Sequence, residues 1–328
     1  MSYFPVVSSI LSPEHLINFI SDAYQLEDIL KCSVLKTGIN HNYLVETEED
    51  KYVFRIYFHN WRTTSEILEE LKLLNYLKNS ISVSYPIKGL NGEYLQYLKA
   101  IEGDRIAVLF SYAEGAFIRN PSADLCYELG KTIANMHVKT ENYHTNRTHY
   151  NANTLVDWAT LKVKSHFLEV ATEELQYFER ANKKIRLTFS KVDVNKLRKG
   201  TIHLDLWYQN MKVKKDNEFT FFDFDNCGNG WLLLDIAYSI MLLFKNEPDK
   251  IEFEAKQTSF YKGYESIIKI SDEEKELIPY GGLAIWLFYT GVHVERYNDF
   301  SNHFLSEEFL KFWISIVDKW MVYNEIEI

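Results

Sequence analysis

The chain has 328 residues, about twice the roughly 150 residues of a typical domain, which predicts one large two-lobed fold or two modest domains. Hydrophobic residues make up 46 % and charged residues 25 % of the sequence, and these globular proportions exclude a chain too polar to order itself. The net charge of −10 supplies no general attraction for nucleic acid or an anionic membrane, so neither is expected as a partner.

Cysteine usage and the N-terminal residues favour a reducing compartment. Cys32, Cys126 and Cys227 are odd in number, far apart and in no CxxC pair, which argues against a disulfide framework and a zinc site. The N-terminus lacks the basic region and cleavage site of a signal peptide. The longest apolar stretches, such as WLLLDIAYSIMLLF, carry an Asp and fall short of the roughly 18 to 20 residues that span a bilayer. We therefore expect a cytoplasmic protein.

Strand and helix patterns alternate in the first third of the chain. The predicted elements are a helix starting at Ser12 and Pro13, strands over 32–47 and 51–58, a helix over 66–77, a hairpin near 85–92 and a strand over 106–115. Thr63 and Glu66 have the spacing of a capping box at the start of the second helix. Residues 1–115 are expected to form an N-terminal lobe that ends in a hinge near Gly115.

The pattern changes to helical periodicity in the remaining residues, 116–328. Predicted helices follow Ser122 and then cover 154–182, 232–245, 250–269, 272–297 and 305–325. One interruption, from Thr201 to Asp225, contains short strand-like runs rich in carboxylates. The fold class is therefore α+β, with a small N-terminal antiparallel sheet and helix and a larger, mainly helical C-terminal lobe.

Five polar residues in the interruption carry the chemistry: His203, Asp205, Asn210, Asp223 and Asp225. Each lies beside apolar residues that a strand or tight loop would bury, and buried carboxylates are usually paired with cations or metals. Phosphoryl transfer needs one carboxylate that accepts the hydrogen bond of the attacking hydroxyl, and an Asn with an Asp that hold Mg²⁺. The spacing suits that division of roles.

These motifs resemble a known superfamily. H-x-D-x-x-x-x-N, a following D-x-D and the tail G-x-x-x-x-D-[IL]-A at 230–237 resemble the C-terminal lobe of the aminoglycoside phosphotransferase and homoserine kinase type II superfamily, relatives of the eukaryotic protein kinases. GINHNYLV is similar to that family's nucleotide-covering hairpin, KYVFRIY to its cation-bearing strand and EILEELKLLNYL to its helix that supplies a Glu. The resemblance covers roughly residues 30–300 and implies a protein-kinase-like bilobal fold.

The resemblance implies a role for each of the five polar residues. Asp205 corresponds to the catalytic Asp that orients and deprotonates the acceptor hydroxyl. Asn210 and Asp223 correspond to the metal ligands. Asp225 is either a further ligand through water or an anchor for its loop, and His203 fixes the catalytic loop by hydrogen bonds. ATP and Mg²⁺ are the implied cofactors.

The nucleotide contacts implied by the resemblance lie in the N-terminal lobe. The loop expected to pass over ATP carries Gly38, Asn40 and Asn42. Arg55 is the cation for the phosphates, with Glu70 as its helix partner and Glu69 or Glu66 as the alternatives. Backbone groups for adenine are expected from four consecutive residues, Phe110, Ser111, Tyr112 and Ala113.

Two positions depart from the family pattern. Arg55 stands where many relatives have Lys, and a planar guanidinium requires a different phosphate geometry from a compact ammonium. Leu204 and Trp207 stand where the family commonly has H-G-D-x-H, so the acceptor pocket is expected to differ.

The sequence thus favours an ATP- and Mg²⁺-dependent kinase that phosphorylates a hydroxyl of a small molecule, such as an amino alcohol, an amino acid like homoserine, or an aminoglycoside. A serine/threonine protein kinase is one alternative, and a catalytically silent protein that binds a nucleotide or metabolite is another. No P-loop, GxGxxG, GxSxG or HExxH motif occurs in the sequence. Oligomeric state and the choice between ATP and GTP stay open.

Every candidate also has a purely structural interpretation. The 203–210 segment could be a surface turn whose polar groups cap the backbone. Gly38, Asn40 and Asn42 could simply shape a hairpin with positive φ. Arg55 and Glu70 could be ordinary solvent-facing charges. His137 is interpreted as a core histidine and Asp235 as a loop anchor. Helical residues that could line an acceptor pocket are interpreted as core or surface: Trp286, Tyr289, Glu295 and Arg296.

Overall fold

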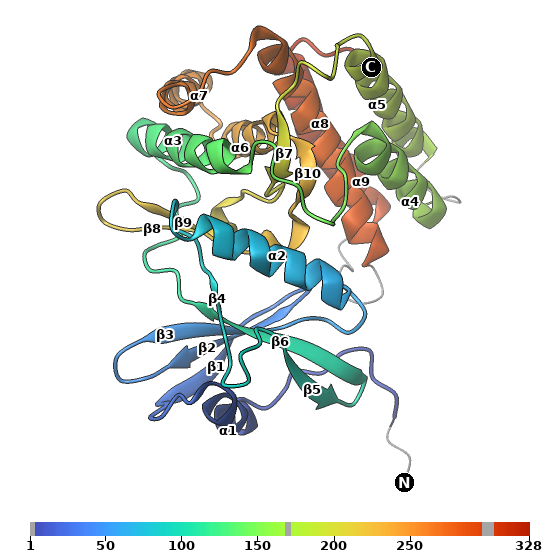
Figure 1. Ribbon diagram of the computed structural model, residues 1–328. Helices are drawn as coiled ribbons and strands as arrows, with labels where there is room; N and C mark the ends of the chain where they lie inside the picture. Colours follow the sequence, from blue (N-terminus) through green and yellow to red (C-terminus); the bar gives the residue numbers. More distant parts are fainter. Residues whose placement is uncertain (1–3, 168–171, 297–304) are drawn as a thin grey trace. The chain divides into compact units, whose positions relative to one another are not determined.

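The computed structural model describes residues 4–167, 172–296 and 305–328. The chain divides into two compact units, Met1–Glu114 and Gly115–Ile328 (Figure 1). Gly115 has a φ of +107°, and a Cβ there would lie 2.3 Å from the carbonyl oxygen of Val213. Only glycine satisfies both constraints, so the turn expected at Gly115 starts the second unit.

A six-stranded antiparallel sheet forms the centre of the first unit. Its strands are β1 (Lys31–Thr37), β2 (His41–Glu46), β3 (Lys51–Ile56), β4 (Pro86–Ile87), β5 (Gln96–Ala100) and β6 (Gly103–Ser111). The spatial order is β1-β2-β3-β6-β4, and β5 also pairs with β6. The single strand expected over 32–47 is therefore two strands, because the chain turns at residues 38–40.

Helix α1 (Pro13–Tyr24) covers one face of this sheet (Figure 1). Its buried residues Leu16 and Ile20 share a core with Phe54 of β3 and Leu109 of β6. Since side chains alternate along a strand, Arg55 belongs to the opposite face from its neighbour Phe54.

Helix α2 (Thr64–Leu77) begins at the expected capping box. The hydroxyl of Thr63 accepts from the backbone N–H of Glu66, and the Glu66 carboxylate accepts from the backbone N–H of Thr63 at 2.8 Å. The buried face of α2 includes Glu70 among apolar residues, which is the placement a paired carboxylate needs.

The second unit is mainly helical (Figure 1). Its helices are α3 (Ala123–Thr140), the π-helix η1 (Asn153–Asp157), α4 (Trp158–Phe167), α5 (Thr172–Ser190), α6 (Leu233–Asn246), α7 (Lys250–Glu265), α8 (Asp272–Glu295) and α9 (Glu307–Tyr323). Two small two-stranded antiparallel sheets interrupt them. One pairs β7 (Lys199–Ile202) with β10 (Gly228–Trp231), and the other pairs β8 (Met211–Val213) with β9 (Phe219–Phe221). The carboxylate-rich interruption expected from the sequence is built from these strands.

Helix α8 is the helix that the sequence predicted over 272–297. By length and composition it could cross a membrane, but 78 % of its most apolar window is buried inside the protein. Trp286 illustrates this, because its ring packs edge-on against Trp313 and Trp320 of α9. Burial of this kind is typical of a core helix.

Candidate active site

The segment between β7 and β8 brings Asp205 and Asn210 together. The side-chain amide nitrogen of Asn210 donates to the backbone oxygen of Asp205 at 3.0 Å and to its Oδ2 at 2.9 Å. Asn210 is buried and lies in a short 3₁₀ turn, Tyr208–Asn210, whereas Asp205 is partly exposed. The expected base and the expected metal ligand are therefore direct neighbours.

His203 is used at both ring nitrogens. Its Nδ1 accepts from the backbone N–H of Asp205 at 3.2 Å, and its Nε2 lies 3.1 Å from the carbonyl oxygen of Phe222. The imidazole ring also packs against the ring of Phe224, with 4.2 Å between the ring centres. These contacts tie the segment that carries Asp205 to the segment that carries Asp223.

Asp235, on α6, holds the backbone before Asp205. Its Oδ2 accepts from the N–H of His203 at 2.9 Å, and its Oδ1 accepts from the N–H of Leu204 at 2.7 Å. The same carboxylate contacts Nε2 of His137, whose Nδ1 lies 2.7 Å from the hydroxyl of Tyr264. Asp235 and His137 are fully buried. Both are therefore anchors within the core of this unit.

Leu204 has a φ of +61°, a left-handed conformation that favours glycine. In this chain a leucine holds that conformation, and Asp235 accepts the backbone N–H groups of His203 and Leu204 beside it.

Two tyrosines from different helices meet at the same loop. Tyr238 of α6 donates to Oδ1 of Asp205 at 2.9 Å, and Tyr289 of α8 donates to the backbone oxygen of Leu204 at 3.0 Å. Burial raises the pKa of both hydroxyls well above the ordinary value, so both stay protonated donors. Sequence reasoning missed Tyr238 and set Tyr289 aside, because residues in apolar helices give no motif.

Asp223 follows β9 in a left-handed conformation, with φ of 63° and ψ of 60°. Burial and the nearby Asp223 carboxylate raise the pKa of Asp205 above its ordinary value, whereas the hydrogen bond from Tyr238 lowers it. Asp225 lies two residues further on, is 4 % exposed, and its backbone oxygen accepts from the guanidinium of Arg147. Asp205 and Asp223 thus interact electrostatically, and Asp225 is built into a buried turn.

The donor chemistry around Asp205 suits a hard cation. The amide nitrogen of Asn210 faces Asp205, which leaves its carbonyl oxygen pointing to the other side of the planar amide. That oxygen and the carboxylate of Asp223 are the ligand types that Mg²⁺ prefers. In the described ranges no group of three or more His, Cys, Asp or Glu residues forms a metal cage. Mg²⁺ commonly binds through one or two protein ligands, with phosphates and water completing its shell.

In the first unit, Arg55 and Glu70 form a buried ion pair. Arg55 Nη1 lies 3.3 Å from Glu70 Oε1, and the two side chains are 8 % and 1 % exposed. Tyr57 donates to the other Glu70 oxygen at 3.1 Å. The guanidinium also lies 5.3 Å from the ring centre of Phe110. The alternative acids have other contacts, because Glu66 caps α2 and Glu69 pairs with Lys72.

The loop residues expected over ATP divide into two kinds. Asn42 lies in β2 opposite Arg55, and its Oδ1 accepts from Arg55 Nε at 3.2 Å. Asn40 is buried, and its Oδ1 accepts from the backbone N–H of Phe58 at 3.1 Å. Asn42 therefore lies in a strand and not in the loop, and it holds the side chain of Arg55. Asn40 holds the backbone just after β3.

Neither the backbone conformation nor the surrounding atoms require a glycine at position 38. Its φ lies outside the left-handed region, so the positive-φ interpretation is wrong. A Cβ at this position would meet only the backbone oxygen of Asn40, at 4.0 Å. The fold has room for a side chain here.

The four residues expected at adenine lie at the end of β6 and after it. Phe110 is inside the sheet, opposite Val53 of β3 and Pro86 of β4. The backbone of Ser111 bonds to Tyr85 and to the hydroxyl of Ser84. Tyr112 and Ala113 follow the strand. Within the described part of the chain, the backbone of Ala113 makes no hydrogen bond, which leaves it available to a ligand.

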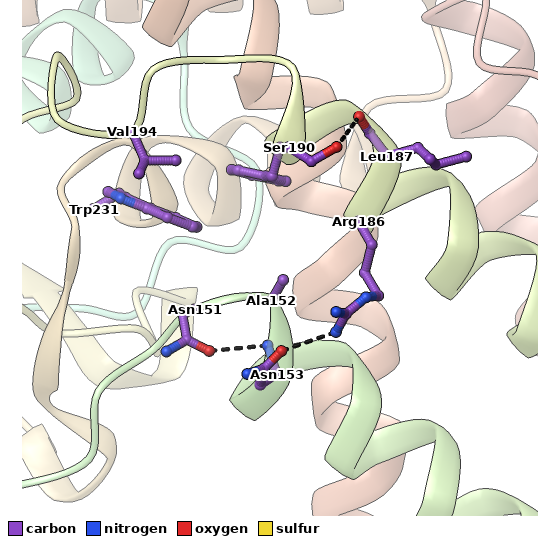
Figure 2. A pocket seen from close by; sticks show the side chains of 9 residues that line it. Asn151, Ala152, Asn153, Arg186, Leu187, Ser190, Val194 and Trp231 are labelled. Atoms are coloured by element: carbon purple, nitrogen blue, oxygen red, sulfur yellow. Dashed lines mark hydrogen bonds between the residues drawn. The ribbon is translucent and has the colours of Figure 1, made fainter.

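A cavity of about 440 Å³ in the second unit lies apart from all of these residues. It is lined by Asn151, Ala152, Asn153, Arg186, Leu187, Phe189, Ser190, Val194 and Trp231 (Figure 2). Its polar groups bond to one another: the N–H of Asn153 donates to Asn151 and the guanidinium of Arg186 donates to Asn153. None of the predicted site residues lines it, so size alone does not mark the site of chemistry.

Comparison with known proteins identifies the family. Residues 32–267, more than half of the chain, match the model of the "Phosphotransferase enzyme family". The homoserine kinase of Rhizobium meliloti (strain 1021) is 27 % identical over 289 residues, covering 86 % of this chain and 85 % of that protein.

Two solved structures show the same fold. Amicoumacin kinase hAmiN, in complex with AMP-PNP, Ca²⁺ and Ami, has a TM-score of 0.74 and 19 % identity and covers 94 % of each chain. A microcompartment-associated aminopropanol kinase has a TM-score of 0.74 and 19 % identity and covers 95 % of this chain and 96 % of its own. The kinase-like α+β fold predicted from the sequence is therefore confirmed. The chain belongs to the phosphotransferase enzyme family and is an enzyme of the kinase class.

Proposed function

We propose that this kinase transfers the γ-phosphoryl group of ATP to a hydroxyl group of a small molecule. The observation that carries the proposal is the contact of Asn210 Nδ2 with Asp205 Oδ2, at 2.9 Å. It joins a carboxylate that can accept the proton of an attacking hydroxyl to an amide that can hold the metal on the phosphates.

Asn210 and Asp223 would hold Mg²⁺, and Asp225 would anchor the turn that presents Asp223. The bound metal would neutralise the charge of the β- and γ-phosphates. Asp205 would accept a hydrogen bond from the acceptor hydroxyl and take its proton as the acceptor oxygen bonds to the γ-phosphorus, while the bond from that phosphorus to the bridging oxygen breaks and ADP leaves. His203 and Asp235 would keep the backbone of this loop in place through the bonds described above.

The first unit would bind the nucleotide. Arg55, held by Glu70 and Asn42, would contact the phosphates with a planar cation. Gly38 would allow the backbone of its loop to approach the phosphates closely, since the fold itself does not require a glycine there. Ala113, whose backbone makes no hydrogen bond in the described chain, would donate and accept at adenine.

The acceptor is proposed to be an amino alcohol, an amino acid such as homoserine, or an aminoglycoside. A relative named homoserine kinase and a neighbour named aminopropanol kinase support this class, because both names describe a hydroxyl on a small molecule that carries an amino group. The ring of Tyr289, which is partly exposed and bonded to the loop of Asp205, is chemically suited to a small organic cation.

An acceptor screen with ATP and Mg²⁺ tests the proposal, with ADP formation and phosphorylated product as the two readouts. Asp205→Asn should abolish transfer while nucleotide affinity stays near that of the wild type. Asp216→Asn is the matched control, because Asp216 is an exposed acid in the turn after β8. Nucleotide binding without turnover on any acceptor would instead support a catalytically silent protein.

A further inference from the structure

Both oxygens of the Asp205 carboxylate receive a hydrogen bond from a side chain. Tyr238 donates to Oδ1 at 2.9 Å, and Asn210 donates to Oδ2 at 2.9 Å. The terminal torsion of an Asp side chain is broad, so one donor leaves the carboxylate free to rotate, whereas two donors fix its plane. We infer, on the basis of the proposed function, that Tyr238 is a positioning residue that aims the Asp205 carboxylate at the acceptor hydroxyl.

Two residues within one turn of helix α6 bind the loop that carries Asp205. Asp235 binds the backbone N–H groups of His203 and Leu204, and Tyr238, three residues later, binds the side chain of Asp205. Residues three apart lie on the same face of a helix. One rigid face therefore sets both the path of the backbone and the orientation of the base.

Tyr289 of α8 lies beside Tyr238, with 5.7 Å between the ring centres. Its hydroxyl donates to the backbone oxygen of Leu204 at 3.0 Å and accepts from the side chain of Asn226 at 3.3 Å. The two tyrosine rings are tilted at 59° to each other. Tyr238 is 6 % exposed, so its ring has little freedom to turn away from Asp205.

Tyr238→Phe removes the hydroxyl and keeps the ring, so it tests the hydrogen bond to Asp205 apart from the packing of the ring. The variant keeps the packing of α6 and loses only the donor to Asp205. We expect kcat to fall about 10- to 100-fold, as for loss of a hydrogen bond to a charged group, with the KM values for ATP and acceptor changed less than about twofold. If Tyr238 served packing alone, the variant would keep both the kcat and the unfolding temperature of the wild type.

Tyr177→Phe is the matched control. Tyr177 of α5 donates to Asp318 of α9 at 3.0 Å and is 8 % exposed, so it makes the same kind of buried Tyr–Asp bond in the same unit. Its removal should leave kcat at the wild-type value. Equal kcat for Tyr238→Phe and the wild type would refute the positioning role.

A crystal structure of the wild type with Mg²⁺ and a nonhydrolysable ATP analogue gives a second readout. The Tyr238 hydroxyl should lie within about 3 Å of Asp205 Oδ1 in that complex. A complex in which the tyrosine has turned away from Asp205 would overturn the inference even if Tyr238→Phe does not fold. A wild type that phosphorylates no acceptor would refute the proposed function. The distance between the Tyr238 hydroxyl and Asp205 Oδ1 in the complex would still show whether Tyr238 positions that carboxylate.

Discussion

Asp235 Oδ1 accepts the backbone N–H of Leu204 at 2.7 Å, and this bond holds a leucine in a left-handed backbone conformation. The side chain of Leu204 is fully buried. The position therefore combines two opposing contributions to the free energy of unfolding: the side chain stabilises the core, and the backbone conformation costs about 1–2 kcal/mol.

The first prediction compares two substitutions of Leu204. Both Leu204→Ala and Leu204→Gly lose the buried side chain, at a cost of about 2–5 kcal/mol, but only glycine relieves the backbone. Leu204→Gly should therefore be the more stable of the two by about 1 kcal/mol, measured by urea unfolding.

Leu206 provides the control for that comparison. It is also buried, at 2 % exposure, but its φ is not positive. There the order should reverse, because glycine costs about 0.5–1 kcal/mol relative to alanine in ordinary backbone conformations. The same order at both positions would contradict the strain assigned to Leu204.

The second prediction concerns the buried pair in the first unit. Glu70→Gln removes the negative charge that pairs with Arg55. Because the Arg55 side chain is only 8 % exposed, the free energy of unfolding should fall by about 3–5 kcal/mol. Glu69→Gln, one residue earlier, breaks a pair in which Lys72 is 66 % and Glu69 15 % exposed, so it should cost less than Glu70→Gln. Similar losses for the two variants would show that Arg55 does not depend on Glu70.

The third prediction separates fold from function at Gly38. Since a Cβ has room there and φ is compatible, Gly38→Ala should leave stability unchanged or raise it by about 0.4–1 kcal/mol. ATP affinity, measured by calorimetry, should nevertheless fall. Gly130→Ala is the contrast, because its Cβ would lie 2.1 Å from the backbone oxygen of Phe260 and must destabilise the protein. Unchanged ATP affinity in Gly38→Ala would remove Gly38 from the nucleotide site.

The fourth prediction is a pH dependence of stability. Hydrogen bonds from Lys256 and Asn120 lower the pKa of Glu247 from 4.5 to about 2. A carboxyl group whose pKa is lower in the folded state stabilises the protein fully above its unfolded pKa, and this contribution is lost as the pH falls through the folded value. Wild-type stability should thus decline between about pH 4.5 and 2 partly through this group.

Glu247→Gln isolates this contribution. The unfolding temperatures of wild type and variant should differ most near pH 6 and converge towards pH 2. Glu254→Gln, an exposed acid on α7 paired with Lys250, is the control and should show little difference at any pH. A constant gap between wild type and Glu247→Gln over the whole range would contradict the lowered pKa.

The order of elements could be predicted because it depends on local patterns. The Thr63–Glu66 capping box and the helical periods of the second unit predicted helices that the structure contains. The break between β1 and β2 does not show in the strand pattern, because residues 32–47 form one strand-like run, and only the resemblance to a nucleotide-covering hairpin indicated a loop there. The helix predicted over 272–297 is α8 (Asp272–Glu295), because its helical period is a local pattern.

Only the site residues that belong to short sequence motifs could be predicted. Asp205 and Asn210 are five residues apart, so one short loop brings them together. Tyr238 and Tyr289 lie 33 and 85 residues from the loop atoms they contact, and nothing local distinguishes them from other helical aromatics. The partner of Asn42 was likewise invisible, since it depends on the register of β2 with β3.

The central claim is a metal-dependent nucleotide site that includes Asp223. The most direct measurement is thermal unfolding of the wild type and Asp223→Ala, each with and without ATP and Mg²⁺. Ligand at about one hundred times its Kd should stabilise the wild type by roughly 2.7 kcal/mol, and the shift should require Mg²⁺ and be lost in Asp223→Ala. An equal shift in both proteins, or a shift without Mg²⁺, would contradict the account.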